Sequence, residues 1–391
     1  MNEETAFLLF EACDFVGFPT GGQLTMARHI MAAFPGEVAL VGIDTDGTSP
    51  IGEWHRRQID GVEYPFFAIR RRAPTAARPL IPARVATYAA LSRYRDAILS
   101  LGVRRAFCQG HETLLAISRW PWESLCYDFP GVANPLGISR YPWARPMAAM
   151  FDRLFFKALR DAHVVLATAD RPAIRDMCQR SDGVLSPEQV RVWPTRVDTS
   201  VFFPAPMDAA RESLKLNPND VVIVTTGRLN WFKGWHLLLE VLRDACGRWR
   251  LIFVGDGEDR EKLLEMARTT GVSDRVTVTG SQSPRQVATY IQAANVFALA
   301  SHHEGFSTSM LEALACGKPI VSTAVSSADT IVEQGINGFV VPSRCSQDFH
   351  AALGDALALP VDKVRTFSLQ RVTAYAVNTI REDLISLWPM N

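Results

Sequence analysis

The sequence lacks an excess of either charge. It has 41 lysine and arginine residues against 41 aspartate and glutamate residues, so the formal net charge is zero. Bulk electrostatics therefore argue against a nucleic-acid partner. Long apolar runs are missing too, since none approaches the roughly 18 residues of a membrane span. The N-terminus, MNEETAFLLFEACD, carries acidic residues where a signal peptide needs basic ones. We therefore expect a cytoplasmic protein, soluble or at most peripheral to a membrane.

Cysteine is present, but not in the spacing of a metal or redox site. The seven cysteines are scattered, with no CxxC pair and no histidine at ligand spacing: Cys13, Cys108, Cys126, Cys178, Cys246, Cys316 and Cys345. We expect them to be reduced thiols in the core of a cytosolic protein. The sequence shows no metal site.

Strand-like apolar runs alternate with helical stretches along the chain, which is typical of parallel sheets built from βαβ units. A chain of 391 residues is too long for one compact core, and each half has enough strands for its own doubly wound sheet. In the first half the expected strands are 6–10, 38–43, 105–108, 124–127, 164–168 and 190–193. In the second half they are 221–225, 251–254, 275–278, 296–300, 320–322 and 338–341.

A segment with prolines at and near its ends, 195–206, is the best candidate for a linker between the two domains. We predict a Rossmann-like domain over 1–198 and a second one over 199–365. The last segment, 366–391, has a helical pattern, and we expect it to pack back on the first domain.

The stretch from Ser301 to Thr323, SHHEGFSTSMLEALACGKPIVST, places two glutamates around the start of a helix. The apolar run before it predicts a buried strand, and Ser307 is a good helix N-cap. Glu304 then lies at the carboxyl end of a strand, where ligands of open α/β sheets bind. Glu312 shares a helical face with Thr308, so both carboxylates can point into one crevice.

Further blocks of glycine and charged residues follow the other strands expected in the second half. They are Gly227-Arg228-Leu229 with Lys233-Gly234, Val254-Gly255-Asp256-Gly257, Gly280-Ser281, Glu304-Gly305-Phe306, and Glu312-Ala313 through Gly317-Lys318-Pro319. In this order and spacing they resemble the nucleotide-sugar-binding half of retaining glycosyltransferases of family 4, the glycosyl transferases group 1. The resemblance covers roughly 221–342 and extends more weakly over the whole chain.

This resemblance implies the GT-B fold, in which two Rossmann-like, doubly wound parallel-sheet domains face a central cleft. The N-terminal domain would bind a carbohydrate or lipid-linked acceptor, and the C-terminal domain the nucleotide sugar. The implied activity is the transfer of a hexose from a UDP- or GDP-linked sugar to an acceptor hydroxyl, with retention, in bacterial glycan, lipopolysaccharide or glycolipid assembly. The resemblance implies no metal and no cofactor besides the donor substrate.

Arg228 and Lys233 are candidate catalytic residues. Both fall in the turn after a strand, where they could meet the two negative charges of a donor diphosphate. Fixed cations at this place stabilise the departing diphosphate more in the transition state than in the ground state. The alternative is an ordinary surface arginine and lysine in a βα loop.

Glu312 would accept hydrogen bonds from the ribose hydroxyls, because a carboxylate is an acceptor only. Glu304 would do the same for the transferred sugar. The alternatives are a helix-surface carboxylate and a loop charge. The remaining donor-binding candidates are residues of glycine turns and of the helix start, where backbone amides can face the donor: Gly255, Asp256, Gly257, Gly280, Ser281, Gly305, Phe306, Ser307 and Thr308. For Asp256 and Gly257 a purely structural turn is the alternative.

The first half contributes four further candidates. Gly21 and Gly22 follow the first strand and match a Gly-Gly turn that, in the resembling family, lets the backbone approach the donor; the pattern is not a GxGxxG fingerprint. His111 follows another strand, and a neutral histidine there could hydrogen-bond a sugar hydroxyl or the leaving oxygen. Asp128 also ends a strand and could contact the acceptor. A structural histidine and a turn-forming aspartate are the alternatives.

One part of the first domain is rich in arginine. Between Arg56 and Arg105 lie nine further arginines: Arg57, Arg70, Arg71, Arg72, Arg78, Arg84, Arg93, Arg95 and Arg104. Such a surface could contact an anionic membrane or a lipid-diphosphate acceptor, and each exposed cation near a membrane contributes roughly 1 kcal/mol. The alternative is a solvated helical face.

Two other functions stay open at this point. Another GT-B enzyme, such as a nucleotide-sugar epimerase or a phosphorylase, would turn over without an added alcohol acceptor. A non-catalytic nucleotide-binding subunit of a glycan-assembly complex would bind UDP or GDP and lose no catalysis when Glu304 is replaced.

Overall fold

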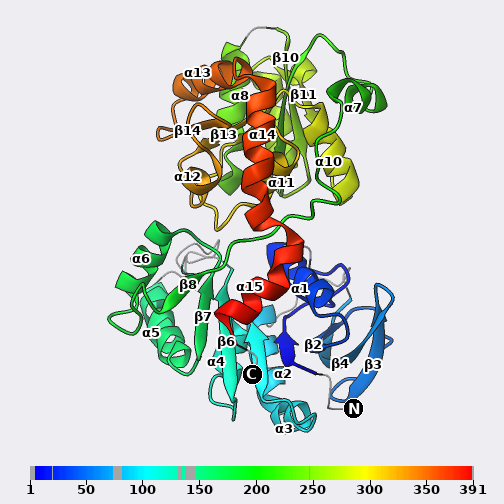
Figure 1. The fold of residues 1–391 in the computed structure, drawn as a ribbon, viewed down its shortest axis with the longest axis vertical. Coiled ribbons are helices and arrows are strands. Elements are labelled where there is room, and N and C mark those ends of the chain that lie inside the picture. The colour runs from blue at the N-terminus through cyan, green and yellow to red at the C-terminus, as the bar shows by residue number, and fades with distance from the viewer. Residues whose placement is uncertain are drawn as a thin grey trace. The chain divides into compact units, whose positions relative to one another are not determined.

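The computed structural model describes residues 5–19, 21–73, 82–130, 134, 136, 146–245 and 247–389. The chain folds into two compact units, each built around its own sheet (Figure 1). The N-terminal unit comprises Met1–Pro194 and Asn378–Asn391, and the C-terminal unit is Thr195–Val377. This confirms the predicted α/β class with one sheet for each half.

The sheet of the N-terminal unit has eight strands in the order β3-β4-β2-β1-β5-β6-β7-β8. Its strands are β1 (Phe7–Phe10), β2 (Val38–Asp44), β3 (Trp54–Ile59), β4 (Val62–Arg71), β5 (Arg105–Cys108), β6 (Ser124–Phe129), β7 (Val164–Ala167) and β8 (Val190–Val192). Its helices are α1 (Gly22–Ala33), α2 (Ala83–Arg93), α3 (Arg95–Leu99), α4 (His111–Ile117), α5 (Ala148–Leu159), α6 (Arg171–Arg180) and α15 (Ile380–Leu387).

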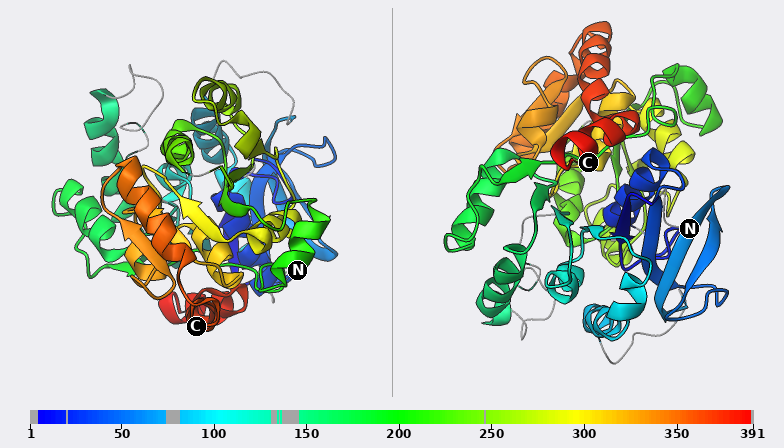
Figure 2. Two further views of the ribbon diagram at one scale, coloured as in Figure 1. Left: turned by 90° about the horizontal axis from the view of Figure 1, so that it is seen from above. Right: turned by 60° about the horizontal axis from the view of Figure 1, so that its bottom comes forward.

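The β3–β4 hairpin at one edge of this sheet was not predicted (Figures 1 and 2). β3 runs antiparallel to β4, and the two strands are joined by Asp60 and Gly61. Both joining residues have positive φ, 50° and 79°, as the two-residue turn of a hairpin requires. An Asp-Gly pair is a strong local signal for a hairpin turn, although the strand before it, Trp54–Ile59, is largely polar. β4 then joins β2 in parallel and extends the Rossmann-like sheet.

The C-terminal unit has a six-stranded, all-parallel sheet in the order β11-β10-β9-β12-β13-β14. Its strands are β9 (Val221–Thr226), β10 (Trp249–Val254), β11 (Val276–Val278), β12 (Val296–Leu299), β13 (Ile320–Thr323) and β14 (Gly338–Val341). Its helices are α7 (Met207–Ser213), α8 (Trp235–Asp244), α9 (Arg260–Thr269), α10 (Pro284–Ala293), α11 (Thr308–Ala315), α12 (Ala328–Ile331), α13 (Ser346–Leu357) and α14 (Val361–Val372).

Both faces of the second sheet are buried, which explains the continuous apolar runs of its strands. Ile223 of β9 packs in a cluster with Leu238 of α8. Its neighbour Val224 faces the other way, into a cluster with Leu311 of α11. Because successive side chains of a strand point to opposite faces, every position of β9 needs an apolar or small side chain.

The boundaries between the units differ from the expected positions after residues 198 and 365. The chain leaves the N-terminal unit after Pro194 and returns to it at Asn378. Backbone hydrogen bonds account for both positions. The amide of Val197 donates to the carbonyl of Tyr375 at 2.8 Å, and the amide of Val377 donates to the carbonyl of Val197 at 3.1 Å. This pairing keeps the start of the predicted linker, and all of α14, in the C-terminal unit.

The C-terminal segment of the N-terminal unit is fixed by α15 and the residue that follows it. α15 packs against α1 (Figure 1), and Arg381 donates to both carboxylate oxygens of Glu37 at 2.8 and 2.9 Å. Trp388 is 1% exposed, and its ring centroid lies 5.2 Å from that of Phe7 in β1. Its indole Nε1 donates to the Ser124 hydroxyl at 2.6 Å.

Five of the cysteines are buried, as expected, but Cys345 is exposed and its thiol donates to Gln347 at 2.8 Å. Cys246 lies outside the described residues. Within the part of the chain that the structure describes, no helix is long and apolar enough to cross a membrane.

Replacing Trp388 with alanine should destabilise the N-terminal unit by about 3–5 kcal/mol, because it leaves a cavity beside β1 and an unpaired hydroxyl on Ser124. Urea denaturation of the full chain, followed by circular dichroism, measures the change. Ile385→Ala, at a residue that is 39% exposed on the helix before Trp388, should cost less than about 1 kcal/mol. Equal stabilities of the two variants would contradict this account of how the C-terminus is anchored.

Candidate functional site

The C-terminal unit has its candidate site where the strand order reverses. β9 is the first strand of this sheet in the chain and β12 the fourth, and the two are neighbours. In open α/β sheets the loops that leave such neighbours at their carboxyl ends diverge, and ligands bind between them. The loop after β9 carries Arg228 and Lys233, and the loop after β12 carries Glu304. The sheet topology thus places three of the four predicted catalytic residues at one switch point.

Lys233 and Glu304 contact each other directly. Lys233 Nζ lies 2.7 Å from Glu304 Oε1, and the hydroxyl of Ser301 donates to the same oxygen at 2.6 Å. The two charged side chains are only 29% and 14% exposed, so water screens the pair less than it screens a surface ion pair. The sequence assigned these residues to separate parts of the donor and did not predict their pairing.

Backbone contacts bring the two loops together. Gly234, which ends the short 3₁₀ helix η2 (Trp231–Lys233), has φ 63°, and a Cβ at this position would lie 1.9 Å from the carbonyl oxygen of Ala300. Only glycine fits this contact. The amide of His302 also donates to the carbonyl of Phe232 at 2.7 Å.

Arg344 holds the second loop from the other side, and sequence reasoning missed it. Its guanidinium donates to the carbonyl of Ser301 at 3.0 Å and to that of Ala300 at 2.8 Å. The hydroxyl of Thr323 donates to the carbonyl of Ser301 at 2.7 Å. A lone arginine more than forty positions along the chain gives no local signal of this contact.

Arg228 forms an ion pair with Glu258, whereas Lys233 forms one with Glu304. The Nε of Arg228 lies 3.0 Å from Glu258 Oε2, and the side chains of Arg228 and Glu258 are both more than half exposed. Exposed ion pairs contribute at most about 1 kcal/mol, so an incoming anion can replace Glu258 at low cost. Arg228, Gly227 and Lys233 line one small cavity of about 10 Å³, roughly the size of one water molecule.

The glycines predicted to face the donor have a packing role in the structure. A Cβ on Gly255, whose φ is 150°, would lie 2.0 Å from the carbonyl oxygen of Gly227, and one on Gly257 would lie 2.1 Å from that of Leu229. Gly255 also forms an isolated bridge with Gly280. The loops after β9, β10 and β11 are thus packed backbone against backbone. For Gly257 this agrees with the alternative of a purely structural turn. The side chain of Asp256 accepts from the amide of Gly257 at 2.8 Å, and Ser281 is exposed beside Gly280.

The start of α11 agrees in part with the sequence prediction. Ser307 is the N-cap, and its hydroxyl accepts from the amide of Met310. The amide of Ser307, expected to face a ligand, instead donates to the hydroxyl of Ser327 at 3.1 Å. Phe306 is buried and packs on Tyr375. The amides of Gly305 and Phe306 and the half-buried Thr308 stay candidates for donor contacts.

Glu312 lies half-buried on α11, and its surroundings change its chemistry. Burial raises the pKa of its carboxyl to about 8, and the positive charge of Lys233 opposes the rise. Near neutral pH the side chain is therefore largely a carboxylic acid, which can donate one hydrogen bond as well as accept others. We had expected Glu312 to be a carboxylate, which can only accept hydrogen bonds. In the free protein near neutral pH, this is its minor form.

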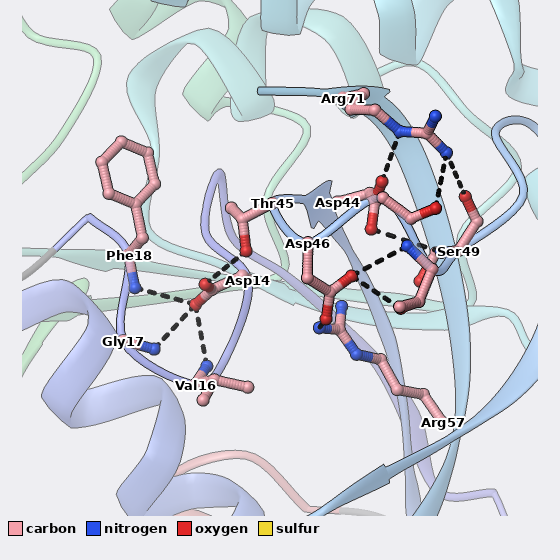
Figure 3. Close-up of polar contacts among 12 residues, drawn as sticks. Asp14, Val16, Gly17, Phe18, Asp44, Thr45, Asp46, Ser49, Arg57 and Arg71 are labelled. Carbon is pink, nitrogen blue, oxygen red and sulfur yellow. Dashed lines mark hydrogen bonds and ion pairs between the residues drawn. The ribbon is translucent and has the colours of Figure 1, made fainter. Parts of the chain in front are cut away.

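In the N-terminal unit, Asp14 organises the glycine loop that precedes α1 (Figure 3). Its Oδ1 accepts from the amides of Val16, Gly17 and Phe18 at 2.9, 2.8 and 2.8 Å, and its Oδ2 accepts from the hydroxyl of Thr45 at 2.8 Å. Burial acts to raise the pKa of Asp14, but these hydrogen bonds outweigh it and hold the pKa below its ordinary value. Sequence reasoning missed Asp14, although an aspartate before a glycine-rich turn is the usual residue for such a role.

Gly21 and Gly22 follow this loop. Gly21 has φ 153°, and Gly22 begins α1. A Cβ at either position would meet nothing within 4 Å. Their surroundings are open, which leaves room for a ligand to approach the backbone.

His111 begins α4 with its ring among aromatic side chains. Its ring centroid lies 4.7 Å from that of Phe155 and 5.9 Å from that of Phe151. Burial, together with the positive charges of Arg84 and Arg180, lowers the pKa of His111 to about 3. The imidazole is therefore neutral at physiological pH, the form that the sequence analysis assumed.

Asp128 lies in the interior instead of at a ligand surface. It is 0% exposed. Its Oδ2 accepts from Gln109 Nε2 at 2.8 Å and its Oδ1 from the hydroxyl of Thr168 at 3.3 Å. Because it links the ends of three neighbouring strands, a direct contact with the acceptor is not supported.

Histidine, cysteine, aspartate and glutamate side chains do not gather in threes suited to a metal ion anywhere in the described ranges.

The amino-acid sequence of the C-terminal unit is similar to that of known proteins. Residues 206–369 match the family model of glycosyl transferases group 1. A D-inositol 3-phosphate glycosyltransferase of Segniliparus rotundus is 35% identical over 182 residues, which cover 44% of this chain and 40% of that relative. The chain thus aligns with less than half the length of this relative.

Solved structures resemble the whole chain. The sucrose-phosphate synthase of Thermosynechococcus elongatus has a TM-score of 0.80 and 19% identity, over 98% of both chains. The HepE protein of Anabaena, solved in complex with UDP and glucose, has a TM-score of 0.72 and 18% identity, again over 98% of both. At this level of identity the similarity establishes a shared fold.

Glu312 should make the stability of the protein depend on pH. The folded state keeps a proton on Glu312 up to about pH 8, whereas an unfolded glutamate, with a pKa of 4.5, releases it, so stability falls as the pH rises between these values. Glu312→Gln removes this loss and should be about 1–3 kcal/mol more stable than the wild type at pH 9, with no such gain at pH 4. Urea denaturation at both pH values measures it. Glu261→Gln, at an exposed position of α9, is the control, and the same response from both variants would contradict the assignment.

Proposed function

We propose that this chain, which has the GT-B fold and matches the family model of glycosyl transferases group 1 over residues 206–369, is a retaining hexosyltransferase. It moves a hexose from a UDP- or GDP-linked sugar to the hydroxyl of a carbohydrate or lipid-linked acceptor. We place the reaction in the assembly of a bacterial glycan, lipopolysaccharide or glycolipid. We assign the donor to the C-terminal unit and the acceptor to the N-terminal unit.

The observation that carries this proposal is the Lys233–Glu304 pair at the β9–β12 switch point. Glu304 Oε1 is occupied by Lys233 and Ser301, and no hydrogen bond from the described residues reaches Glu304 Oε2. That second oxygen is available to hydroxyls of the transferred sugar. Lys233 in turn holds positive charge beside the sugar, where the bond to the diphosphate breaks. One ion pair thus positions the sugar and balances the charge that leaves it.

The reaction breaks the bond between the anomeric carbon and a diphosphate oxygen and forms one between that carbon and the acceptor oxygen. The electron pair of the broken bond stays on the diphosphate, and the acceptor hydroxyl gives up its proton. Lys233 and Arg228 offset the new negative charge, and this is why we expect no metal cofactor. Neutral His111 contributes a hydrogen bond to a sugar hydroxyl without adding a buried charge.

The donor is supported by what the relatives bind. HepE was solved with UDP and glucose, and the relative from Segniliparus rotundus is named for a glycosyl transfer. We therefore favour a UDP-linked hexose as the first donor to test.

A thermal-shift panel of UDP, GDP and their sugar conjugates would identify the donor. A ligand present at 100 times its Kd adds about 2.7 kcal/mol of stability. We expect one nucleotide series to stabilise the protein and the other to have little effect. No shift with any member of the panel would contradict the proposal.

Turnover assays separate the proposed function from its alternatives. Glu304→Gln keeps the size of the side chain but weakens the bond to Lys233, and we expect about a 100-fold to 1,000-fold loss of sugar transfer with nucleotide binding retained. Glu265→Gln, on the exposed face of α9, should leave transfer unchanged. Nucleotide binding by the wild type without any sugar transfer would favour a non-catalytic subunit. Transfer within about twofold of the wild type in Glu304→Gln would contradict the role of Glu304, and turnover without an acceptor would favour an epimerase.

A further inference from the structure

The loop after β9 exposes a large aromatic side chain next to the candidate donor site. Trp231 is the first residue of η2, two positions before Lys233, and it is 52% exposed. Scattered apolar side chains are common on protein surfaces. Trp231 differs from such a residue because neighbouring rings hold its indole in place, and because unpaired polar atoms lie beside it.

Two aromatic neighbours fix the indole of Trp231. The ring of Phe232 stacks on it, with the centroids 4.8 Å apart and an interplanar angle of 22°. The ring of His302 meets it at 63°, with the centroids 4.3 Å apart. Offset-stacked and edge-to-face pairs of this kind are favourable. The indole is therefore already ordered, and a ligand that packs on it costs little additional side-chain entropy.

The Trp231–His302 contact and the Lys233–Glu304 ion pair join the same two loops. The amide of His302 donates to the carbonyl of Phe232 at 2.7 Å, which ties the loops together beside both contacts. Lys233 follows Trp231 by two positions, and Glu304 follows His302 by two. Because residues two apart in a chain have Cα atoms at most about 7 Å apart, a ligand that Glu304 holds is within reach of the indole.

Two polar atoms next to the indole lack partners. One is Oδ1 of Asn230, the residue before Trp231, and the other is Nε2 of His302. Both atoms are buried, and neither has a hydrogen-bond partner in the part of the chain that the structure describes. Buried polar atoms seldom stay unpaired, because an unmade hydrogen bond costs free energy. Each of these two atoms therefore calls for a partner from outside the protein.

Both unpaired groups are uncharged near pH 7. Burial, together with the positive charges of Arg344, His236 and His303, lowers the pKa of His302 to about 4. The amide oxygen of Asn230 accepts hydrogen bonds, and a neutral imidazole has one nitrogen that donates and one that accepts, so a hydroxyl suits either group. An aromatic surface with neutral polar atoms beside it fits a sugar ring, which has apolar C–H faces and a rim of hydroxyls. A charged ligand or a wholly apolar one fits it less well.

We propose that Trp231 is a stacking platform for the transferred hexose, with hydroxyls of the same sugar bonded to Asn230 Oδ1 and His302 Nε2. This inference rests on the proposed function, because it concerns the donor of that transfer. The indole packs against C–H groups of the sugar ring and removes them from water. The nucleotide does not touch the indole in this arrangement. Trp231 thus contributes to the affinity for the sugar and determines which hexose the protein accepts.

Isothermal titration calorimetry of the full chain with UDP-glucose and with UDP tests the platform. We expect Trp231→Ala to weaken the binding of UDP-glucose about 5- to 20-fold and to leave that of UDP within about twofold of the wild type. Trp231→Phe keeps an aromatic face and should lose at most about threefold. Phe203→Ala is the matched control and should change neither affinity. Phe203 is 48% exposed in the same unit, and its carbonyl accepts from Gln292 of α10, at the opposite edge of the sheet.

The same titrations examine the hydrogen bond to His302. His302→Phe keeps an aromatic ring against Trp231 but removes Nε2, and we expect it to weaken the binding of UDP-glucose about 3- to 10-fold relative to that of UDP. His303→Phe, at the exposed neighbouring position, should leave both affinities unchanged. The same loss in both histidine variants, or no loss in either, would show that Nε2 does not bind the sugar.

UDP binding and sugar transfer by the wild type distinguish the possible failures. If Trp231→Ala weakens UDP and UDP-glucose equally, or weakens neither, the platform is wrong, and the proposed function stands as long as the wild type transfers the sugar. If the thermal-shift panel selects the GDP series, GDP and GDP-mannose replace UDP and UDP-glucose in these titrations. If the wild type binds no member of either series, both the platform and the proposed function are wrong.

Discussion

The close approach of two loop backbones, at Gly234 and Ala300, is the contact on which the candidate donor site depends. It exists because β9 and β12 are neighbours in a parallel sheet, so that their loops leave the same edge. Arg344 and Thr323 hold the second loop by its carbonyls, and the contact then sets Lys233 against Glu304. A side chain at Gly234 would separate the loops and with them the ion pair.

Each unit contains a partly buried titratable side chain that is largely neutral near pH 7. Burial raises the pKa of Glu312 in the C-terminal unit to about 8 and lowers that of His111 in the N-terminal unit to about 3, so both side chains are largely neutral near pH 7. Buried groups that are already neutral avoid most of the desolvation cost of a charged ligand site. At the candidate donor site Arg228 and Lys233 are each paired with a glutamate, and a negatively charged substrate can replace the exposed one of these glutamates, Glu258, at low cost.

The sequence predicted the fold and many of the site positions, because both follow from local patterns. Apolar runs located twelve of the fourteen strands in the described ranges, and the glycine and charge blocks fell at strand ends as the topology requires. The directions in which individual side chains point could not be predicted from the sequence. The turn of Arg228 toward Glu258, the burial of Asp128, and the bond between Lys233 and Glu304 each depend on residues distant in the chain. The β3–β4 hairpin and Asp14 had local signals that were overlooked.

The central claim is that a sugar nucleotide binds between the loops that follow β9 and β12. Hydrogen–deuterium exchange with and without UDP-glucose tests it most directly, because bound ligand slows exchange at the amides it covers. The account predicts slower exchange at 227–234 and 301–308, with β14 and α13 unchanged. Protection confined to other segments, under conditions in which the ligand binds, would contradict it.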